Sequence, residues 1–208
     1  MKRLVLAVGV LALTLFCGNA HAAFVFSNFG PGDTFATSVG YALDPSQTLG
    51  MKFTATGGGT LSQINLALST SGGSTAVTVE FYADNANTIG TLLASGSTTT
   101  NGALGTAHPP SVAIMSAAAI VSGTDYWVVA KSTGNNAWNL TSPATFGRVA
   151  FSHNGGASYS YANNAIQSAF SVEAAPANAV PEPSSLALLS FGGLAFVRKL
   201  RRSKPVVA

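Results

Sequence analysis

The region between the two apolar ends of the chain contains six carboxylates, the residue type that a polysaccharide hydrolase would use. Such an enzyme places one carboxyl group on each side of the glycosidic bond, one as the acid and the other as base or nucleophile. The six are Asp33, Asp44, Glu80, Asp84, Asp125 and Glu173. They are scattered, and three of the aspartates stand in turn contexts where Asp commonly bonds its own backbone. We therefore expect no enzyme and no catalytic residues, with an extracellular polysaccharide-active hydrolase as the alternative.

Two histidines, His108 and His153, are the candidate bases or metal ligands of the same region. His108 precedes two prolines, and His153 precedes an Asn-Gly-Gly turn. No Gly-x-Ser-x-Gly nucleophile elbow accompanies them. Without a neighbouring carboxylate or cysteine they make a poor zinc site. We expect exposed loop histidines and no metal centre built on them.

Calcium has two candidate loops that offer oxygen ligands, residues 29–33, which end in Asp33, and residues 84–87, which combine Asp and Asn. Neither stretch has the spacing of an EF-hand loop. Clusters of Asp and Asn more often reflect turn chemistry, because their side chains mimic backbone turns. We expect no cofactor, and a structural Ca²⁺ in these loops is the open alternative.

Sugar binding would need exposed aromatic rings beside polar groups, and three aromatic residues meet this description. Trp138 stands between Asn136 and Asn139, and Tyr159 and Tyr161 lie near an Asn-Asn pair. A ring can stack on a sugar face while amides bond its hydroxyls. The alternative is that Trp138 packs under a loop and the two tyrosines close a sheet edge.

Short β-strands separated by Gly, Ser and Asn turns must position these side chains. Apolar and polar residues alternate with a period of two, which is typical of half-buried strands. The candidate strands are residues 49–55, 64–69, 77–82, 91–96, 111–115, 125–131, 147–152, 158–162 and 168–173. Residues 125–131 are almost continuously apolar and should be buried on both faces, and residues 115–121 suit either one helical turn or a loop. The pattern predicts an all-β single domain, a β-sandwich or jelly roll.

The charges of the chain are concentrated at its two ends, where seven of the ten Lys and Arg residues lie. The region between them keeps three basic side chains, Lys52, Lys131 and Arg148, against the six carboxylates, a net charge of −3 with histidine neutral. This balance excludes the basic footprint of a nucleic-acid-binding protein. Its surface should be polar and mostly uncharged, which suits the cell exterior or a hydrated polysaccharide.

The N-terminus has the three parts of a secretory signal peptide. Lys2 and Arg3 precede an apolar run over residues 4–16, and Ala20 and Ala22 form a small-x-small cleavage site. Cleavage there would leave Ala23 as the first residue. The only cysteine, Cys17, would leave with the signal peptide, so disulfides cannot contribute to the exported chain.

The C-terminus combines a helix-breaking triplet, a short apolar run and a basic cluster. Pro181, Glu182 and Pro183 hold the chain extended, and the apolar run covers residues 186–197. From Ser184 to the end of that run there are 14 residues, about 21 Å as a helix. A bilayer core needs about 30 Å, so we expect a short transmembrane helix suited to transient insertion. The basic stop contains Arg198, Lys199, Arg201 and Arg202.

This tail resembles the PEP-CTERM sorting signal of Gram-negative, exopolysaccharide-producing bacteria. The matching residues are Val180, Pro181, Glu182 and Pro183, followed by the apolar run and the basic cluster from Arg198. The resemblance implies recognition by the membrane enzyme exosortase, after the export machinery and a transient passage through the inner membrane. The protein would then reach the cell envelope or extracellular matrix.

The region before the tail resembles the choice-of-anchor β domains, closest to the R type. The resemblance rests on residues 26–33, 49–69, 77–85 and 122–130, in that order. It implies an extracellular β-sandwich without an established activity, so no catalytic residues are carried over from it.

These observations together predict four segments. They are a signal peptide at 1–22, a β-sandwich domain at 23–173, a linker at 174–180 and a sorting signal at 181–208. The function we expect is a structural or adhesive protein of the cell surface or exopolysaccharide matrix, with exopolysaccharide as a candidate partner and no nucleic acid.

Replacing Pro181, Glu182 and Pro183 with alanine should leave the β domain folded and change where the protein is found. The reason is that the triplet belongs to the predicted sorting signal and lies outside the predicted strands. Immunolabelling of intact cells, compared with labelling of cell fractions, measures the change. Normal surface delivery of this variant would contradict the role of the triplet in sorting.

Overall fold

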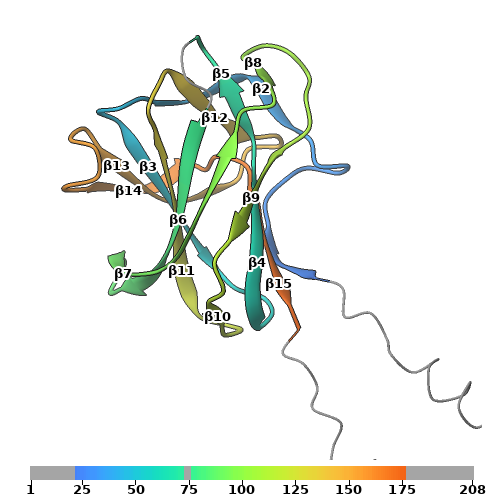
Figure 1. Ribbon diagram of the computed structural model, residues 1–208, viewed down its shortest axis with the longest axis vertical. Helices are drawn as coiled ribbons and strands as arrows, with labels where there is room; N and C mark the ends of the chain where they lie inside the picture. Colours follow the sequence, from blue (N-terminus) through green and yellow to red (C-terminus); the bar gives the residue numbers. More distant parts are fainter. Residues whose placement is uncertain (1–21, 73–75, 177–208) are drawn as a thin grey trace, which may run out of the picture. The chain divides into compact units, whose positions relative to one another are not determined.

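The computed structural model describes residues 22–72 and 76–176, and in these residues the chain forms fifteen β-strands and no helix (Figure 1). The strands are β1 (Ala23–Ser27), β2 (Phe35–Leu43), β3 (Thr48–Thr54), β4 (Gly59–Leu66), β5 (Leu68–Thr70), β6 (Ala76–Asn85), β7 (Thr88–Thr99), β8 (Gly102–Ala103), β9 (Ser111–Met115), β10 (Ala119–Ile120), β11 (Asp125–Ser132), β12 (Asn136–Thr141), β13 (Phe146–Ser152), β14 (Ser160–Ile166) and β15 (Phe170–Ala175). The all-β prediction is confirmed. The helical turn considered for residues 115–121 is wrong, because β10 pairs with β4 there.

The strands form one large sheet and one small sheet. The large sheet has the order β1-β15-β4-β9-β7-β6-β11-β3-β13-β14, with β10 beside β4, and all of its pairs are antiparallel. The small sheet has the order β2-β12-β5-β8, in which β5 and β8 are parallel. Figure 1 shows the large sheet curling around one interior, with the small sheet at its upper end. This arrangement is consistent with the predicted β-sandwich.

A single apolar core fills the interior of the curled sheet. Alternate residues of each strand point inward, as the two-residue period of a strand requires. On β3 the inward residues are Leu49, Met51 and Phe53, each 4% exposed or less. Residues 126–130 of β11 are all buried, which confirms the prediction that this strand is covered on both faces.

Aromatic rings form the centre of this core. The ring of Phe53 lies 4.8 Å from Phe26, 6.3 Å from Phe81 and 6.0 Å from Tyr126, measured between ring centroids. It also lies 5.8 Å from Phe170, in an edge-on contact. These five rings come from β3, β1, β6, β11 and β15, so one cluster joins strands from both ends of the sheet order.

Most predicted strands correspond to observed ones. The predicted ranges 49–55, 111–115, 125–131 and 147–152 match β3, β9, β11 and β13 to within one residue at each end. The predicted ranges 77–82 and 91–96 lie inside β6 and β7, which extend up to three residues further. The range 64–69 is divided between β4 and β5, and the ranges 158–162 and 168–173 begin two residues before β14 and β15. The boundaries shift because pairing with a neighbouring strand, which sequence periodicity does not register, decides where a strand ends.

Five observed strands, β1, β2, β8, β10 and β12, were not expected from the sequence. β12 has the sequence Asn-Ala-Trp-Asn-Leu-Thr, which reads as a polar loop. The buried amide of Asn139 on this strand is bonded to distant groups: its Nδ2 donates to the carbonyl oxygens of Ala36 and Thr37 at 2.9 and 3.0 Å. Buried polar groups are stable only when bonded in this way, so β12 depends on β2 being beside it.

The end of the domain lies slightly beyond its predicted boundary. β15 continues through Ala175, and Ala174 is 2% exposed and belongs to the core, so the first two residues of the predicted linker are part of the sheet. Linker residues 177–180, the sorting signal with its predicted helix at residues 186–197, and residues 1–21 of the signal peptide lie outside the described residues. Within residues 22–72 and 76–176, no helix is long and apolar enough to span a membrane.

Replacing Phe53 with alanine should lower the free energy of unfolding by about 3–5 kcal/mol, because it removes the ring that touches four others and leaves a cavity. A urea titration followed by tryptophan fluorescence measures the change. Val121→Ala is the matched control: Val121 is 59% exposed, and its truncation should change the free energy by less than about 0.5 kcal/mol. Equal losses in the two variants would show that the aromatic cluster is not central to stability.

Candidate functional site

Two of the carboxylates that look scattered in the sequence meet at Lys52. This lysine lies on β3, and Asp125 and Asp84 lie on β11 and β6, the next two strands of the sheet. Lys52 Nζ lies 2.9 Å from Asp125 Oδ2 and 3.3 Å from Asp84 Oδ1. It also donates to Asn87 Oδ1 at 2.6 Å. Carboxylates that are scattered in the sequence are therefore brought together in the fold at this lysine.

The environment of this cluster keeps both carboxylates ionised. Burial by itself raises the pKa of Asp84, but hydrogen bonds from the Asn87 backbone N–H and the Trp127 indole N–H, together with the nearby ammonium, place this pKa below its usual value. The Lys52 ammonium and the Thr54 hydroxyl lower the pKa of Asp125. A glycosidase acid instead needs a raised pKa, so that it holds a proton at neutral pH. The arrangement fits an ion-pair cluster better than an acid and base pair.

The β6–β7 hairpin covers this outer face of the sheet. The Ile89 backbone N–H donates to the Tyr161 hydroxyl at 3.1 Å, and Arg148 Nε donates to the carbonyl oxygen of Asn87 at 2.8 Å. The Tyr161 ring then packs against Trp127 at 5.5 Å, with the Arg148 guanidinium 5.1 Å from its centroid. Tyr161 is therefore half-buried between neighbours, in the sheet-closing role that was the alternative to sugar binding.

Tyr159 lies beside a hollow of about 300 Å³ on the same side of the molecule. The hollow is lined by Phe151, His153, Asn154, Ser158, Tyr159 and Ser160. Burial, followed by the negative charge of Glu80, raises the pKa of Tyr159 to about 12, so its hydroxyl stays protonated at neutral pH. Glu80 itself pairs with Lys131 at 2.8 Å and accepts a hydrogen bond from Tyr82 at 2.7 Å. Of the three predicted sugar-binding aromatics, Tyr159 is the one that lines a hollow.

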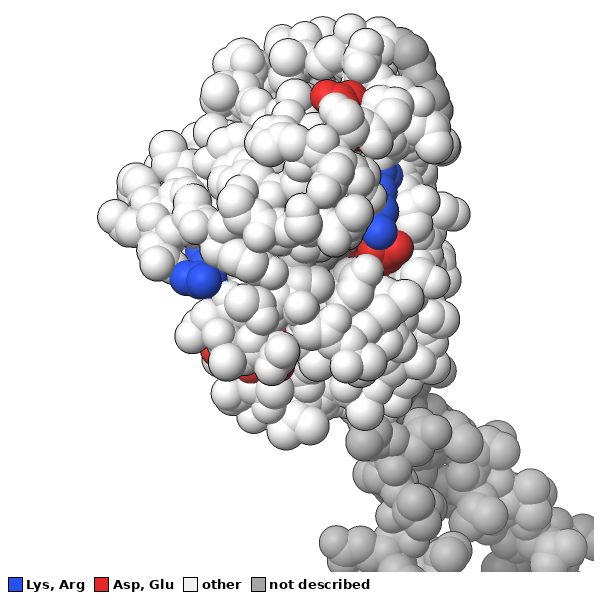
Figure 2. All heavy atoms as spheres, turned by 90° about the vertical axis from the view of Figure 1, so that its left-hand side faces the viewer, with Lys and Arg blue, Asp and Glu red and all other residues white. Residues whose placement is uncertain are grey.

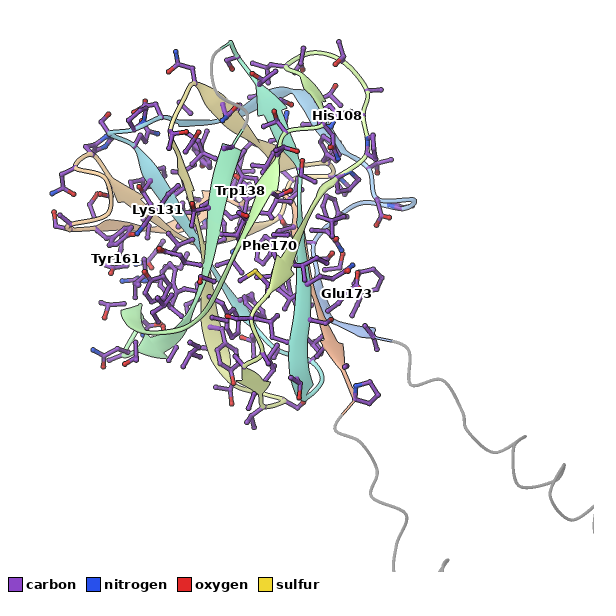
Figure 3. All side chains as sticks on the ribbon, in the orientation of Figure 1. His108, Lys131, Trp138, Tyr161, Phe170 and Glu173 are labelled. Carbon is purple, nitrogen blue, oxygen red and sulfur yellow. The ribbon has the colours of Figure 1, made fainter. Side chains whose placement is uncertain are left out.

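Trp138 is not available to a sugar, and the prediction that it is exposed is wrong. Its side chain is fully buried, with the indole N–H donating to the Ala169 carbonyl oxygen at 3.0 Å. Its ring meets the edge of Phe170 at 5.9 Å, and Figure 3 shows both residues in the interior. The flanking amides that indicated a polar surface, Asn136 and Asn139, are themselves buried.

His108 is also more constrained than expected. Its Nε2 lies 2.9 Å from the Ser69 hydroxyl, which in turn donates to Asn139 Oδ1 at 2.6 Å. His108 is half-buried, so the expectation of an exposed histidine is wrong here, whereas His153 is exposed as expected. Ser69 is fully buried and donates its proton to Asn139. The hydrogen bond between His108 and Ser69 therefore ties the loop after β8 to β5, which pairs with β12.

The two candidate calcium loops differ in what their carboxylates do. The Asp84 oxygens accept hydrogen bonds from Trp127 and Asn87, and the Lys52 ammonium occupies the position a cation would take. Asp33 stays exposed, in a loop where its φ is 58°. Within residues 22–72 and 76–176, no three His, Cys, Asp or Glu residues are grouped so that they could hold a metal ion.

Comparison with known proteins identifies the C-terminal tail. Residues 179–202 match the PEP-CTERM protein-sorting motif. The match contains Val180, Pro181, Glu182, Pro183, Arg198, Lys199, Arg201 and Arg202, which lie outside the described residues. It confirms the predicted sorting motif and indicates a secreted protein that exosortase sorts to the cell envelope or surface. No curated protein shows significant similarity to the chain.

Stability should fall in acid because of the cluster at Lys52. The pKa values of Asp84 and Asp125 are lower in the folded chain than in the unfolded one. Their contribution is therefore complete above about pH 5 and is lost as the pH falls through the folded-state pKa values. Replacing Lys52 with methionine should lower the free energy of unfolding at pH 7 by about 1–3 kcal/mol, because it leaves two carboxylates without their cation. Urea titrations at several pH values measure both effects.

Carboxyl NMR titration provides the control for this prediction. The Lys52→Met variant should raise the pKa values of both Asp84 and Asp125. Lys131→Met also removes one lysine charge on the same face, but this lysine pairs with Glu80. The variant should therefore leave the titrations of Asp84 and Asp125 unchanged. Unaltered Asp84 and Asp125 titrations in Lys52→Met would contradict the assignment.

Proposed function

We propose that this protein is a non-enzymatic structural or adhesive component of the cell envelope or exopolysaccharide matrix. The observation that carries the proposal is the PEP-CTERM motif at residues 179–202, which addresses the attached β domain to the surface. Delivery of a domain by such a motif requires no activity in the domain itself. In this proposal the protein passes only transiently through the inner membrane, and its tail interacts with exosortase and the export machinery.

The state of the carboxylates supports a domain without catalysis. Asp84 and Asp125 share one lysine and have lowered pKa values, and Glu80 is paired with Lys131. Each of these pairs stabilises contacts between strands, and none combines a protonated acid with a free base. A polysaccharide-active hydrolase would need that combination.

The surface supports an adhesive or matrix role. Figure 2 shows charged side chains as small, separate patches on a face otherwise made of uncharged atoms. Such a surface exchanges hydrogen bonds with hydrated polysaccharide without strong attraction to nucleic acid. The hollow beside Tyr159 adds an aromatic ring among hydroxyl and amide groups, the combination that sugars use. The resemblance of the domain to choice-of-anchor β domains agrees with this role.

The test compares retention and hydrolysis by the exported protein. We expect the protein to be retained in the extracellular matrix of the producing cells and released by enzymatic digestion of the polysaccharide. Incubation with purified exopolysaccharide should release no new reducing ends. Release of reducing ends that disappears in Asp84→Asn or Asp125→Asn would favour the hydrolase, and a freely soluble protein that leaves the matrix in a single wash would contradict adhesion.

A further inference from the structure

One outer face of the large sheet is left uncovered by residues 22–72 and 76–176, in contrast to the face covered by the β6–β7 hairpin. It is formed by β1, β15, β4 and β9, which are neighbours in that order. The register aligns Phe24, Glu173, Gln63 and Ile114 in one row across the four strands. A second row contains Ser27, Ser171, Asn65 and Val112. Figure 3 shows Glu173 on this side, away from Tyr161 and Lys131.

The centre of this face holds a carboxylate in a fixed position. Gln63 Nε2 and Asn65 Nδ2 both donate to Glu173 Oε1 at 2.8 Å. Asn65 Nδ2 also lies 2.9 Å from the Ser171 hydroxyl. Within the described residues, no hydrogen bond reaches the second oxygen, Oε2. A group held by two amides and keeping one oxygen for another partner is pre-organised for binding, because little side-chain freedom remains to be lost.

Apolar and polar side chains together form a hollow of about 270 Å³ beside this carboxylate. The lining residues are Phe24, Phe29, Asp33, Asn65, Pro109, Pro110, Val112, Ser171 and Glu173. Phe24 is 57% exposed, an unusual exposure for a phenylalanine in a strand. The volume lies just below the range of about 300–1,000 Å³ typical of pockets for drug-sized ligands, so the hollow suits a single small ring.

The charge of the hollow is negative and not neutralised by the domain. Two of its lining residues, Asp33 and Glu173, are carboxylates. The three basic side chains of residues 22–72 and 76–176 lie on β3, β11 and β13 and contact other partners. Neither Asp33 nor Glu173 has an ion-pair partner among these residues. A cationic group that enters the hollow therefore gains attraction without displacing an existing pair.

We propose that this hollow binds an amino-sugar unit of an extracellular polysaccharide, with its ammonium at Glu173 and Asp33 and its ring against Phe24. The inference rests on the adhesive function proposed above and names its ligand class. A pyranose presents an apolar C–H face, which matches the exposed ring of Phe24, and it has hydroxyls at its rim for the polar lining groups. A lysine side chain would supply the ammonium but neither the ring nor the hydroxyls.

The test is titration calorimetry of the exported protein with two sugar hexamers, one of glucosamine and one of N-acetylglucosamine. We expect the glucosamine hexamer to bind at least about tenfold more tightly at low salt, because acetylation removes the charge. This difference should shrink at about 300 mM salt, where partly exposed charges are screened. Equal affinity for the two hexamers, or no binding of the glucosamine hexamer, would overturn the proposal.

Five variants test whether the glucosamine hexamer binds in this hollow. Glu173→Gln should weaken binding of the glucosamine hexamer about tenfold, and Phe24→Ala about three- to tenfold, whereas Phe24→Tyr keeps the ring and should bind normally. Phe146 is 59% exposed on β13 and does not line the hollow, so Phe146→Ala is the matched control for Phe24. Asp44→Asn removes a charge in the turn after β2 and controls for net charge. Equal affinity of all five variants would overturn the site.

Matrix retention separates this proposal from the broader one. If Glu173→Gln loses the glucosamine hexamer and is also washed out of the matrix, the hollow provides the adhesion. If the protein is retained in the matrix but binds neither hexamer, the amino-sugar assignment is wrong and the adhesive function stands. If the protein binds the hexamer but is not retained, the adhesive function is wrong and the site stands. The melting temperature of each variant, measured in parallel, shows that the fold is unchanged.

Discussion

The contact between Phe53 on β3 and Phe170 on β15, 5.8 Å between ring centroids, holds together two strands that are far apart in the sheet. Five strands separate them in the pairing order, so the two rings meet only because the sheet curls around them. Phe26, Phe81 and Tyr126 extend this cluster to β1, β6 and β11. With no cysteine among the described residues and three basic side chains to form ion pairs, apolar burial is the main source of stability. The curling of the large sheet around this cluster determines which residues lie on its outer faces.

Because alternate residues point into the core, the residues between them lie on the outside of the sheet. Two parts of this outer surface differ in how they are covered and in how their charges are paired. On β3, β11 and β6 the outer residues include Trp127, which the β6–β7 hairpin covers, and Lys52 forms ion pairs with the two carboxylates beside it. On β1, β15, β4 and β9 nothing within the described residues covers the face, and Glu173 is held only by amides. On the face formed by β3, β11 and β6, these charged side chains pair with one another and stabilise the fold. The face formed by β1, β15, β4 and β9 keeps a charge that a ligand can use.

Sequence periodicity predicted the strands whose polar and apolar residues separate cleanly, such as β3, β6, β9 and β11. It failed at β12, because Trp138 with asparagines on both sides resembles an exposed loop. Those asparagines are buried, and their hydrogen-bond partners include Ser132, Ser69 and the backbone of β2. The same cause explains His108, whose partner Ser69 lies 39 positions away. Asn139 and His108 look exposed in the sequence because their partners are distant, whereas Asn136 is buried against Ser132, only four positions away.

The sequence by itself determined the destination of this protein, because the sorting motif at residues 179–202 is contiguous and is recognised as an ordered string of residues. It also determined the all-β class, since a two-residue period is a local property of the chain. Only the tertiary structure decided which carboxylates are paired and which aromatic rings are exposed. Asp84 and Asp125 meet, Trp138 is buried and Phe24 is open because of the register between strands distant in sequence. Register depends on how the whole core packs, and no short stretch of sequence contains that information.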